Sequence, residues 1–296
     1  MFELYSQHEQ ALRVRALLED FELIYVLGYS ALIPKGELYS DLRSNVQAAV
    51  LATGLGLTSV DYVRKTYLKG ERKADSEYKE DLLREKYNRA YQDAKNYIYN
   101  MTTKLVTEGR DEPTVGVFGA SLVLEKLSSS FFSAHLLYKL GQKHEAHAVS
   151  RMILEQLAWA YAAHGTDDMN IIKRLKPTKC IHELRQLDSR YGKLYGYLSK
   201  KVHLDHSNHY DIFETEHGKN IVIHARPDFF EYGLTILTLA DLFGIVWEIS
   251  QANFLDKYEA ITFSNGVPIV NEGREFLKLI ERYTQEIDQL NANSQS

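Results

Sequence analysis

Long stretches of apolar residues spaced three and four apart, with little proline or glycine between them, most restrict how this chain can fold. That spacing gathers apolar side chains on one face of an α-helix. The 296 residues include 5 prolines and 17 glycines, too few for the many turns of a sandwich or barrel. The sequence therefore predicts an all-α protein, a multi-helix bundle.

Proline, glycine and capping residues divide this pattern into separate elements. The expected helices cover residues 3–32, 37–52, 58–67, 75–106, 115–140, 143–164, 178–203, 227–260 and 272–290. The turn at Gly141 predicts an αα-hairpin at the centre of the bundle. Two short strand-like runs, 210–213 and 221–224, flank a turn sequence and predict one small β-hairpin near residues 210–225.

Residues 109–113, which contain Gly109 and Pro113, are the clearest candidate linker. We expect an N-terminal helical region over residues 1–110 and a helical bundle core over 111–296, or else one continuous domain. The helix expected over 75–106 is densely charged outside its apolar positions. It is either a solvated outer helix or a surface for a homo-oligomer or a partner protein.

The lone cysteine, Cys180, cannot form an internal disulfide, which fits a reducing compartment. No basic start followed by a short apolar run opens the chain, so no signal peptide is expected. The most apolar stretch, residues 233–247, is too short to cross a membrane and contains Asp241. We expect a cytoplasmic protein that is not inserted in a membrane.

Charge is distributed unevenly along the chain. The net charge of −5 argues against a protein coated for nucleic acid, yet residues 173–201 hold nine basic residues against two acidic ones. On a helix these residues form a basic face beside an apolar one, and the candidate phosphate- or RNA-binding residues are Arg190, Lys193, Tyr197, Lys200 and Lys201. Basic side chains interleaved with a tyrosine suit phosphates and a stacked base. A solvated basic face is the alternative.

Arg151 and Glu155 lie one helical turn apart in an otherwise apolar stretch. A charged pair in such surroundings predicts either a structural ion pair or a polar pocket, with both side chains largely buried. His203, His206 and His209 are spaced three apart, but two histidines on one helix side do not complete a zinc site. Nucleotide-binding and metalloprotease motifs are absent from the sequence, so we expect no metal and no cofactor.

The segment Ser150-Arg151 to Glu155, followed by Trp159 and Tyr161, and the segment Tyr195 to His203 resemble an uncharacterised prokaryotic helical family, a domain of unknown function that is remotely similar to HEPN domains. The resemblance covers roughly residues 115–249. It implies a helical core with Arg151, Glu155 and His203 at the matching polar positions.

HEPN ribonucleases, common in toxin and antiphage systems, cut RNA without metal, using an Arg and a His four to six residues apart on one helix. This chain departs from that pattern, because Arg174 and His182 come nearest and Pro177 lies between them. An arginine and a histidine from different helices could still meet, with Arg151 binding phosphate and His203 moving a proton.

The sequence thus predicts an RNA- or nucleotide-directed protein of bacterial defence or stress type, a metal-independent HEPN-like ribonuclease in its sharpest form. Its candidate catalytic residues are Arg151, Glu155 and His203. The alternatives are a non-enzymatic helical scaffold or ligand-binding subunit that acts through protein partners, and a metal-binding protein that uses the histidine cluster.

Overall fold

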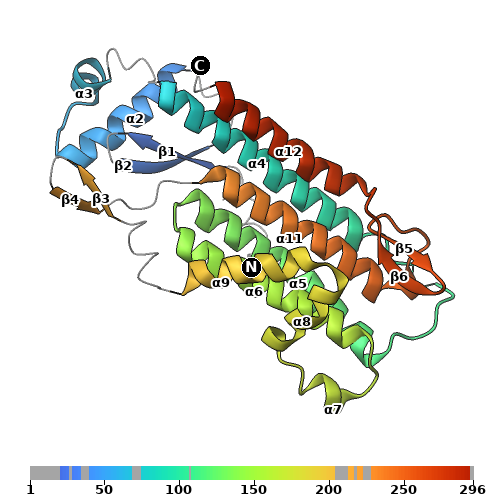
Figure 1. Ribbon diagram of the computed structural model, residues 1–296. Coiled ribbons are helices and arrows are strands. Elements are labelled where there is room, and N and C mark those ends of the chain that lie inside the picture. The colour runs from blue at the N-terminus through green and yellow to red at the C-terminus, as the bar shows by residue number, and fades with distance from the viewer. Residues whose placement is uncertain are drawn as a thin grey trace, which may run out of the picture. The chain divides into compact units, whose positions relative to one another are not determined.

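The computed structural model describes residues 21–26, 29–34, 40–68, 75–106, 108–203, 213–216, 219–222 and 228–293. Helices dominate these residues, as Figure 1 shows, and the predicted all-α bundle is confirmed. The chain divides into two compact units, residues 1–77 and 78–296. The expected division at residue 110 therefore falls inside the second unit, where residues 109–113 join two of its helices.

The first unit begins with a β-hairpin where the sequence predicted a helix. Strands β1 (Phe21–Val26) and β2 (Tyr29–Pro34) pair antiparallel, with Phe21 opposite Pro34 and Val26 opposite Tyr29. The helix predicted over residues 3–32 is therefore wrong in this part, and residues 3–20 lie outside the described chain. β-Branched and aromatic residues fill β1, and such side chains pack well on a pleated surface.

Two helices complete the described part of this unit, and both were predicted. Helix α2 (Ser40–Leu55) is followed by Gly56, which has a φ of 66°. Glycine adopts this left-handed conformation at little cost, and it commonly follows the last residue of a helix. Helix α3 (Val60–Tyr67) starts at Ser59, whose Oγ accepts a hydrogen bond from the Tyr62 backbone N–H at 3.2 Å. A small apolar core joins the two helices, and its buried residues are Ala48, Leu51, Ala52 and Val63.

The second unit is built around helix α11 (Phe229–Ser250), which is apolar on nearly all sides. It packs against α5 (Val115–Lys139) and α6 (Lys143–His164), the predicted αα-hairpin, and against α12 (Glu275–Asn293). An all-round apolar helix needs such enclosure because no face of it suits water. Helix α11 ends at Ser250, about ten residues before the predicted end.

Helix α4 (Asp75–Thr102) also belongs to this core. Its apolar residues Tyr87, Tyr91 and Ile98 are buried within the chain. Tyr97 stacks on Phe276 of α12 with ring centroids 4.0 Å apart. The apolar positions that suggested a partner surface on α4 thus pack inside the chain, and a partner would have to use the charged face of the helix.

A buried ion pair ties α11 to the start of α12. Arg274 donates from Nε and Nη2 to the two carboxylate oxygens of Asp241 at 2.7 and 2.6 Å. The side chains are 1% and 3% exposed. Two parallel bonds satisfy both charges, which is the arrangement that a buried pair requires.

The segment after α11 turns back as a second hairpin that the sequence analysis missed. Strands β5 (Ile261–Ser264) and β6 (Val267–Val270) pair through Asn265 and Gly266, both with positive φ. Asn-Gly between two apolar runs is a strong hairpin signal. The buried Glu248 carboxylate accepts hydrogen bonds from the backbone N–H groups of residues 259–261 and fixes the start of this hairpin on α11.

The predicted hairpin near residues 210–225 is confirmed by β3 (Phe213–Glu216) and β4 (Lys219–Val222), which pair antiparallel.

By length and composition, α5 and α11 could each cross a membrane, and a bent pair over Ser44–Leu55 and Val60–Tyr67 could be a third span. In this structure 78% of the most apolar window of α11 is buried within the chain, against 28% for α5.

Candidate functional site

Helix α9 (Ser189–Val202) carries all five predicted RNA-binding residues and packs along α6. Its N-cap is Asp188, whose Oδ1 accepts a hydrogen bond from the Arg190 backbone N–H at 2.8 Å. Its C-cap is His203, whose backbone N–H donates to the Ser199 carbonyl. The helix therefore ends where the predicted histidine stands, beside the middle of α6.

Arg151 of α6 lies at the centre of a polar cluster between the two helices. Its Nε donates to Glu155 Oε1 at 2.9 Å and its Nη2 donates to the Tyr195 hydroxyl at 3.0 Å. Its Nη1 lies 3.5 Å from His203 Nε2. The guanidinium carbon also lies 5.1 Å from the centroid of the Tyr195 ring. The structure thus brings together all three residues that the sequence singled out as catalytic, and adds Tyr195.

The cluster is more open than the sequence predicted. The Arg151 and Glu155 side chains are 20% and 19% exposed, so they are partly rather than largely buried. Burial lowers the pKa of Arg151, but hydrogen bonds from its guanidinium to Tyr195 and Glu155 outweigh burial and hold the pKa above its ordinary value. The guanidinium is therefore a permanent, partly solvated cation with its orientation fixed.

His203 meets Arg151 through Nε2, and this contact has a chemical consequence. An arginine N–H can donate to an imidazole nitrogen only when that nitrogen carries a lone pair. When Nε2 carries that lone pair, it can accept a hydrogen bond from Arg151 or a proton from a ligand. An exposed imidazole beside a fixed guanidinium is a suitable pair for an anionic group and proton transfer.

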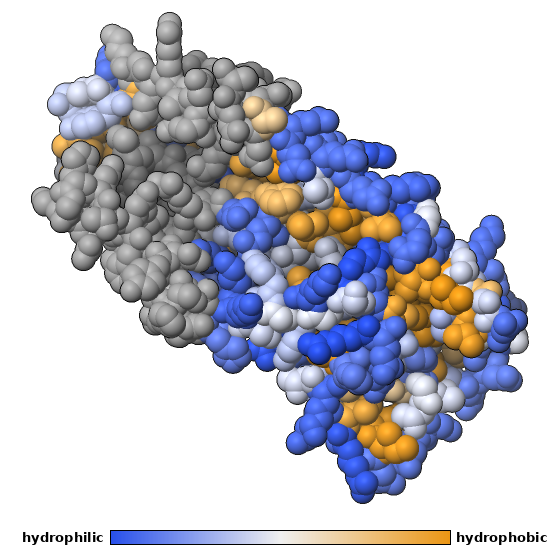
Figure 2. Space-filling view, in the orientation of Figure 1, coloured by the Kyte–Doolittle hydropathy of each residue, from blue (hydrophilic) through white to orange (hydrophobic). Residues whose placement is uncertain are grey.

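The five predicted RNA-binding residues fall into two groups. Lys193 and Lys200 are exposed on α9, where Figure 2 shows hydrophilic side chains. Arg190 instead pairs with Asp188, with Nε 2.6 Å from Oδ2. Tyr197 donates from its hydroxyl to Glu231, and Lys201 Nζ lies 5.7 Å from the centroid of the Tyr197 ring. Arg190 and Tyr197 are thus bonded to carboxylates of this chain, whereas Lys193 and Lys200 present exposed side chains.

Behind the cluster lies a buried hydrogen-bonded chain that the sequence analysis missed. His147, 1% exposed, places Nε2 3.0 Å from Glu231 Oε1 and Nδ1 3.0 Å from the Tyr138 hydroxyl. The Tyr138 hydroxyl lies 3.1 Å from Ser150 Oγ. Through Glu231 and Tyr197 these hydrogen bonds link α9 to α5, α6 and α11. The spacing of His147 and Arg151, one turn apart, was the available signal.

Three buried polar atoms on α6 and α9 have no hydrogen-bond partner within the described residues: His144 Nε2, the Tyr191 hydroxyl oxygen and Ser199 Oγ. His144 also contacts α9 through Nδ1, which lies 3.3 Å from the Lys201 carbonyl oxygen. Unsatisfied buried polar atoms are rare in folded proteins and often mark a place for a water or a ligand.

The histidine cluster proposed as a metal site is described at His203, whereas His206 and His209 lie outside the described residues. In the part of the chain that the structure describes, no group of three or more His, Cys, Asp or Glu residues has a geometry that could hold a metal ion.

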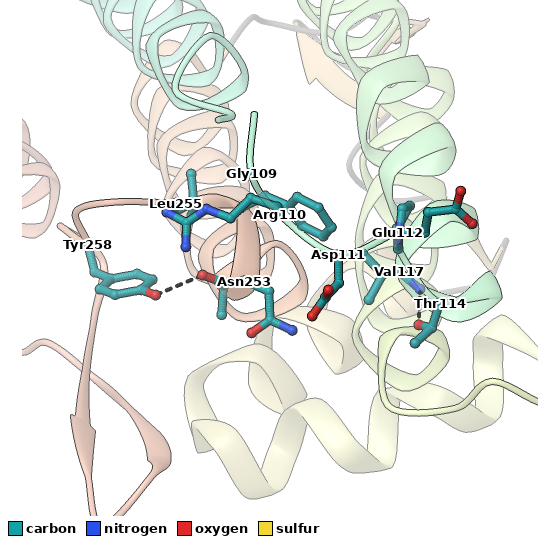
Figure 3. A pocket seen from close by; sticks show the side chains of 12 residues that line it. Gly109, Arg110, Asp111, Glu112, Thr114, Val117, Asn253, Leu255 and Tyr258 are labelled. Atoms are coloured by element: carbon teal, nitrogen blue, oxygen red, sulfur yellow. Dashed lines mark hydrogen bonds between the residues drawn. The ribbon is translucent and has the colours of Figure 1, made fainter. Parts of the chain in front are cut away.

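A cavity of about 500 Å³ opens near the linker, lined by residues 109–114 and 252–255 among others. Figure 3 shows Asp111 beside it, between Asn253 and Thr114. Arg110 pairs with Asp256, 2.5 Å from Nη2 to Oδ1. The cavity thus has a solvent-exposed carboxylate on its rim and an arginine already neutralised.

Comparisons of this chain with protein-family models, curated proteins and solved structures found no match.

Proposed function

We propose that this chain is an RNA- or nucleotide-directed protein of bacterial defence or stress type, acting in the cytoplasm as a metal-independent ribonuclease. The observation that carries the proposal is the contact between Arg151 Nη1 and His203 Nε2 at 3.5 Å. Two helices supply these side chains, so the pair replaces the single-helix Arg and His of HEPN ribonucleases. Arg151 binds a phosphate and His203 moves a proton.

Arg151 has capacity for such a ligand. A guanidinium carries five N–H donors, and its contacts to Glu155, Tyr195 and His203 involve three of its nitrogens with one bond each. Two N–H groups remain for phosphate oxygens. A phosphate that also takes over the Nη1–H group facing His203 leaves the Nε2 lone pair to accept the proton of a ribose 2′-hydroxyl.

Lys193 and Lys200 add a basic surface on the side of α9 that faces away from Tyr195, because the turn of an α-helix places both roughly opposite that residue. They lie on α9 with Tyr195, and lysines along an exposed helix neutralise successive phosphates without reading bases. Glu155 acts as the positioning residue, because its carboxylate holds Arg151 Nε at 2.9 Å.

One observation favours the second candidate, a non-enzymatic scaffold. Arg190 and Tyr197, two of the predicted RNA-binding residues, make intramolecular bonds to Asp188 and Glu231. In that reading the Arg151 cluster is an interhelical clamp that fixes α9 to α6 for use by a protein partner.

Filter binding with single-stranded RNA at two salt concentrations separates the two candidates. The proposal predicts that affinity falls steeply with salt, because each phosphate contact releases condensed counterions. The double variant Lys193→Glu/Lys200→Glu should lose affinity for every RNA sequence. Lys126→Glu/Lys257→Glu, which changes two exposed lysines elsewhere, is the matched control and should bind as the wild type does.

Absence of RNA binding by the wild-type chain at low salt would refute the proposal and favour the scaffold. Equal loss in both double variants would show that net charge, rather than α9, determines binding.

A further inference from the structure

The end of the second unit formed by the start of α5 and by α7 (Met169–Ile172) exposes apolar side chains that the proposed function does not use. Phe118 and Leu122 of α5 are 54% and 52% exposed, and Met169 and Ile171 of α7 are 46% and 50% exposed. Large apolar side chains gathered at one end of a folded unit are typical of an interaction surface. Figure 2 shows apolar residues bordered by hydrophilic ones over α7, at the lower end of the view.

The two helices are held together at this end. The Val115 backbone N–H, at the start of α5, donates to Asp167 Oδ1 at 2.9 Å, and Asp168 caps α7 through the Asn170 N–H at 2.7 Å. A side chain on Gly116 would place Cβ 2.1 Å from the Ala163 carbonyl oxygen, so the start of α5 lies directly against the end of α6. The exposed apolar residues therefore belong to a rigid part of the fold.

Charges of opposite sign border the apolar residues. Asp111 and Glu112 precede α5, and both are exposed on the rim of the linker cavity (Figure 3). The exposed basic residues Lys173, Arg174 and Lys176 follow α7. In the sequence, acidic residues thus precede α5 and α7, where Asp167 and Asp168 also stand, and basic residues follow α7.

We propose that this surface binds a second copy of the chain in a two-fold symmetric dimer. In such a contact the same surface faces itself, so the acidic border of one copy meets the basic border of the other twice. The apolar residues are buried at the centre. The linker cavity, with Asp111 and Glu112 on its rim, receives a basic side chain from the other copy.

Charge complementarity favours this occupant over an anionic one. A lipid surface or an RNA would be attracted by the basic border and repelled by the carboxylates of the acidic border, whereas a second copy satisfies both borders. The surface uses none of the residues that contact Arg151, so the dimer does not depend on the proposed ribonuclease activity.

Light scattering after size exclusion, over a range of concentrations and at low salt, tests the proposal. The wild type is expected to form a dimer whose dissociation constant rises by about tenfold or more in Ile171→Glu, because the variant buries a charge at the apolar centre. Val267→Glu changes a side chain that is 60% exposed on β6, and it should dimerise as the wild type does.

A charge exchange makes the test specific. Lys173→Glu/Arg174→Glu/Lys176→Glu makes both borders acidic, and Asp111→Lys/Glu112→Lys makes both borders basic. Each variant should be monomeric by itself, and an equimolar mixture should form a heterodimer. A wild-type monomer at all concentrations, a dimer that survives in each variant, or a mixture that stays monomeric would overturn the proposal. Binding of a monomeric wild type to anionic vesicles, lost in Ile171→Glu, would assign the surface to lipid instead and would also overturn it.

Discussion

Two arginine–carboxylate pairs in the second unit differ in what surrounds them. Arg274 and Asp241 are 1% and 3% exposed, and two parallel hydrogen bonds join them. Arg151 and Glu155 are 20% and 19% exposed, and one hydrogen bond joins them. The first pair uses its donors within the fold, whereas the second keeps donors available at the surface. The same residue types therefore form a buried structural pair in one place and a partly solvated pair in the other.

The largest expected effect follows from breaking the buried pair. Asp241→Ala leaves the Arg274 charge buried without its partner and should lower the free energy of unfolding by about 3–5 kcal/mol. Glu155→Ala leaves a partly solvated arginine and should lower it by about 1 kcal/mol. Urea unfolding of both variants measures the difference. Equal losses would contradict the distinction between the two pairs.

Glu248→Gln should have the next largest effect. Glu248 uses both carboxylate oxygens to accept three backbone N–H groups, at 2.7, 2.8 and 3.0 Å, whereas a glutamine offers one oxygen. We expect a loss of about 2–3 kcal/mol and faster hydrogen exchange at residues 259–261, because donors are left unsatisfied. Unchanged exchange in that segment would show that Glu248 does not fix the hairpin.

Two helix glycines differ in the space around them: α11 packs more tightly on α4 at Gly244 than α5 packs on α6 at Gly119. A Cβ on Gly244 of α11 would lie 2.0 Å from the Tyr97 hydroxyl oxygen, whereas one on Gly119 of α5 would meet Trp159 at 3.5 Å. Gly244→Ala should therefore destabilise by about 1–2 kcal/mol through overpacking. Gly119→Ala should stabilise by about 0.5–1 kcal/mol through helix propensity. Thermal unfolding of the two variants checks both signs, and a stabilising Gly244→Ala would mean that α4 and α11 are less tightly packed.

The smallest effect concerns the start of α9. Burial raises the pKa of Asp188, but hydrogen bonds from Arg190 outweigh burial and hold that pKa below its ordinary value. A lowered pKa in the folded state gives stability that is present above the ordinary value and lost as pH falls through the folded value. The stability advantage of the wild type over Asp188→Asn should thus be present at pH 6 and shrink on acidification below about pH 4. A constant difference across that range would contradict the role of the Asp188 charge.

Periodicity in the sequence predicted the structure of some parts of the chain and not of others. Periodicity located α5, α6 and α11 because a buried helix face imposes its spacing on the sequence. It failed at β1, where apolar and β-branched residues fit a helix as well as a strand. The Asn265-Gly266 turn carried a signal that was overlooked. Asp241 was noted as an oddity of α11, but its partner Arg274 lies 33 positions away and no local pattern connects them.

The candidate site shows the same limit. Residue types pointed to Arg151, Glu155 and His203, and helical spacing joined the first two. The contact between Arg151 and His203, 52 positions apart, depends on how α9 packs on α6, which a helical wheel cannot provide. Tyr195, His147 and Glu231 were missed for the same reason, because their contacts cross between helices.

Cleavage of single-stranded RNA in the presence of EDTA tests the proposed Arg151–His203 centre, with wild type, His203→Ala and Arg151→Lys compared at equal folded fraction. We expect metal-independent cleavage by the wild type and its loss in His203→Ala, because the proton acceptor is gone. Arg151→Lys should retain RNA binding but cleave at least about tenfold more slowly, since a lysine keeps the charge without the fixed fork of donors. RNA cleavage that is unchanged in His203→Ala, or no cleavage by a wild-type chain that binds RNA, would contradict the account.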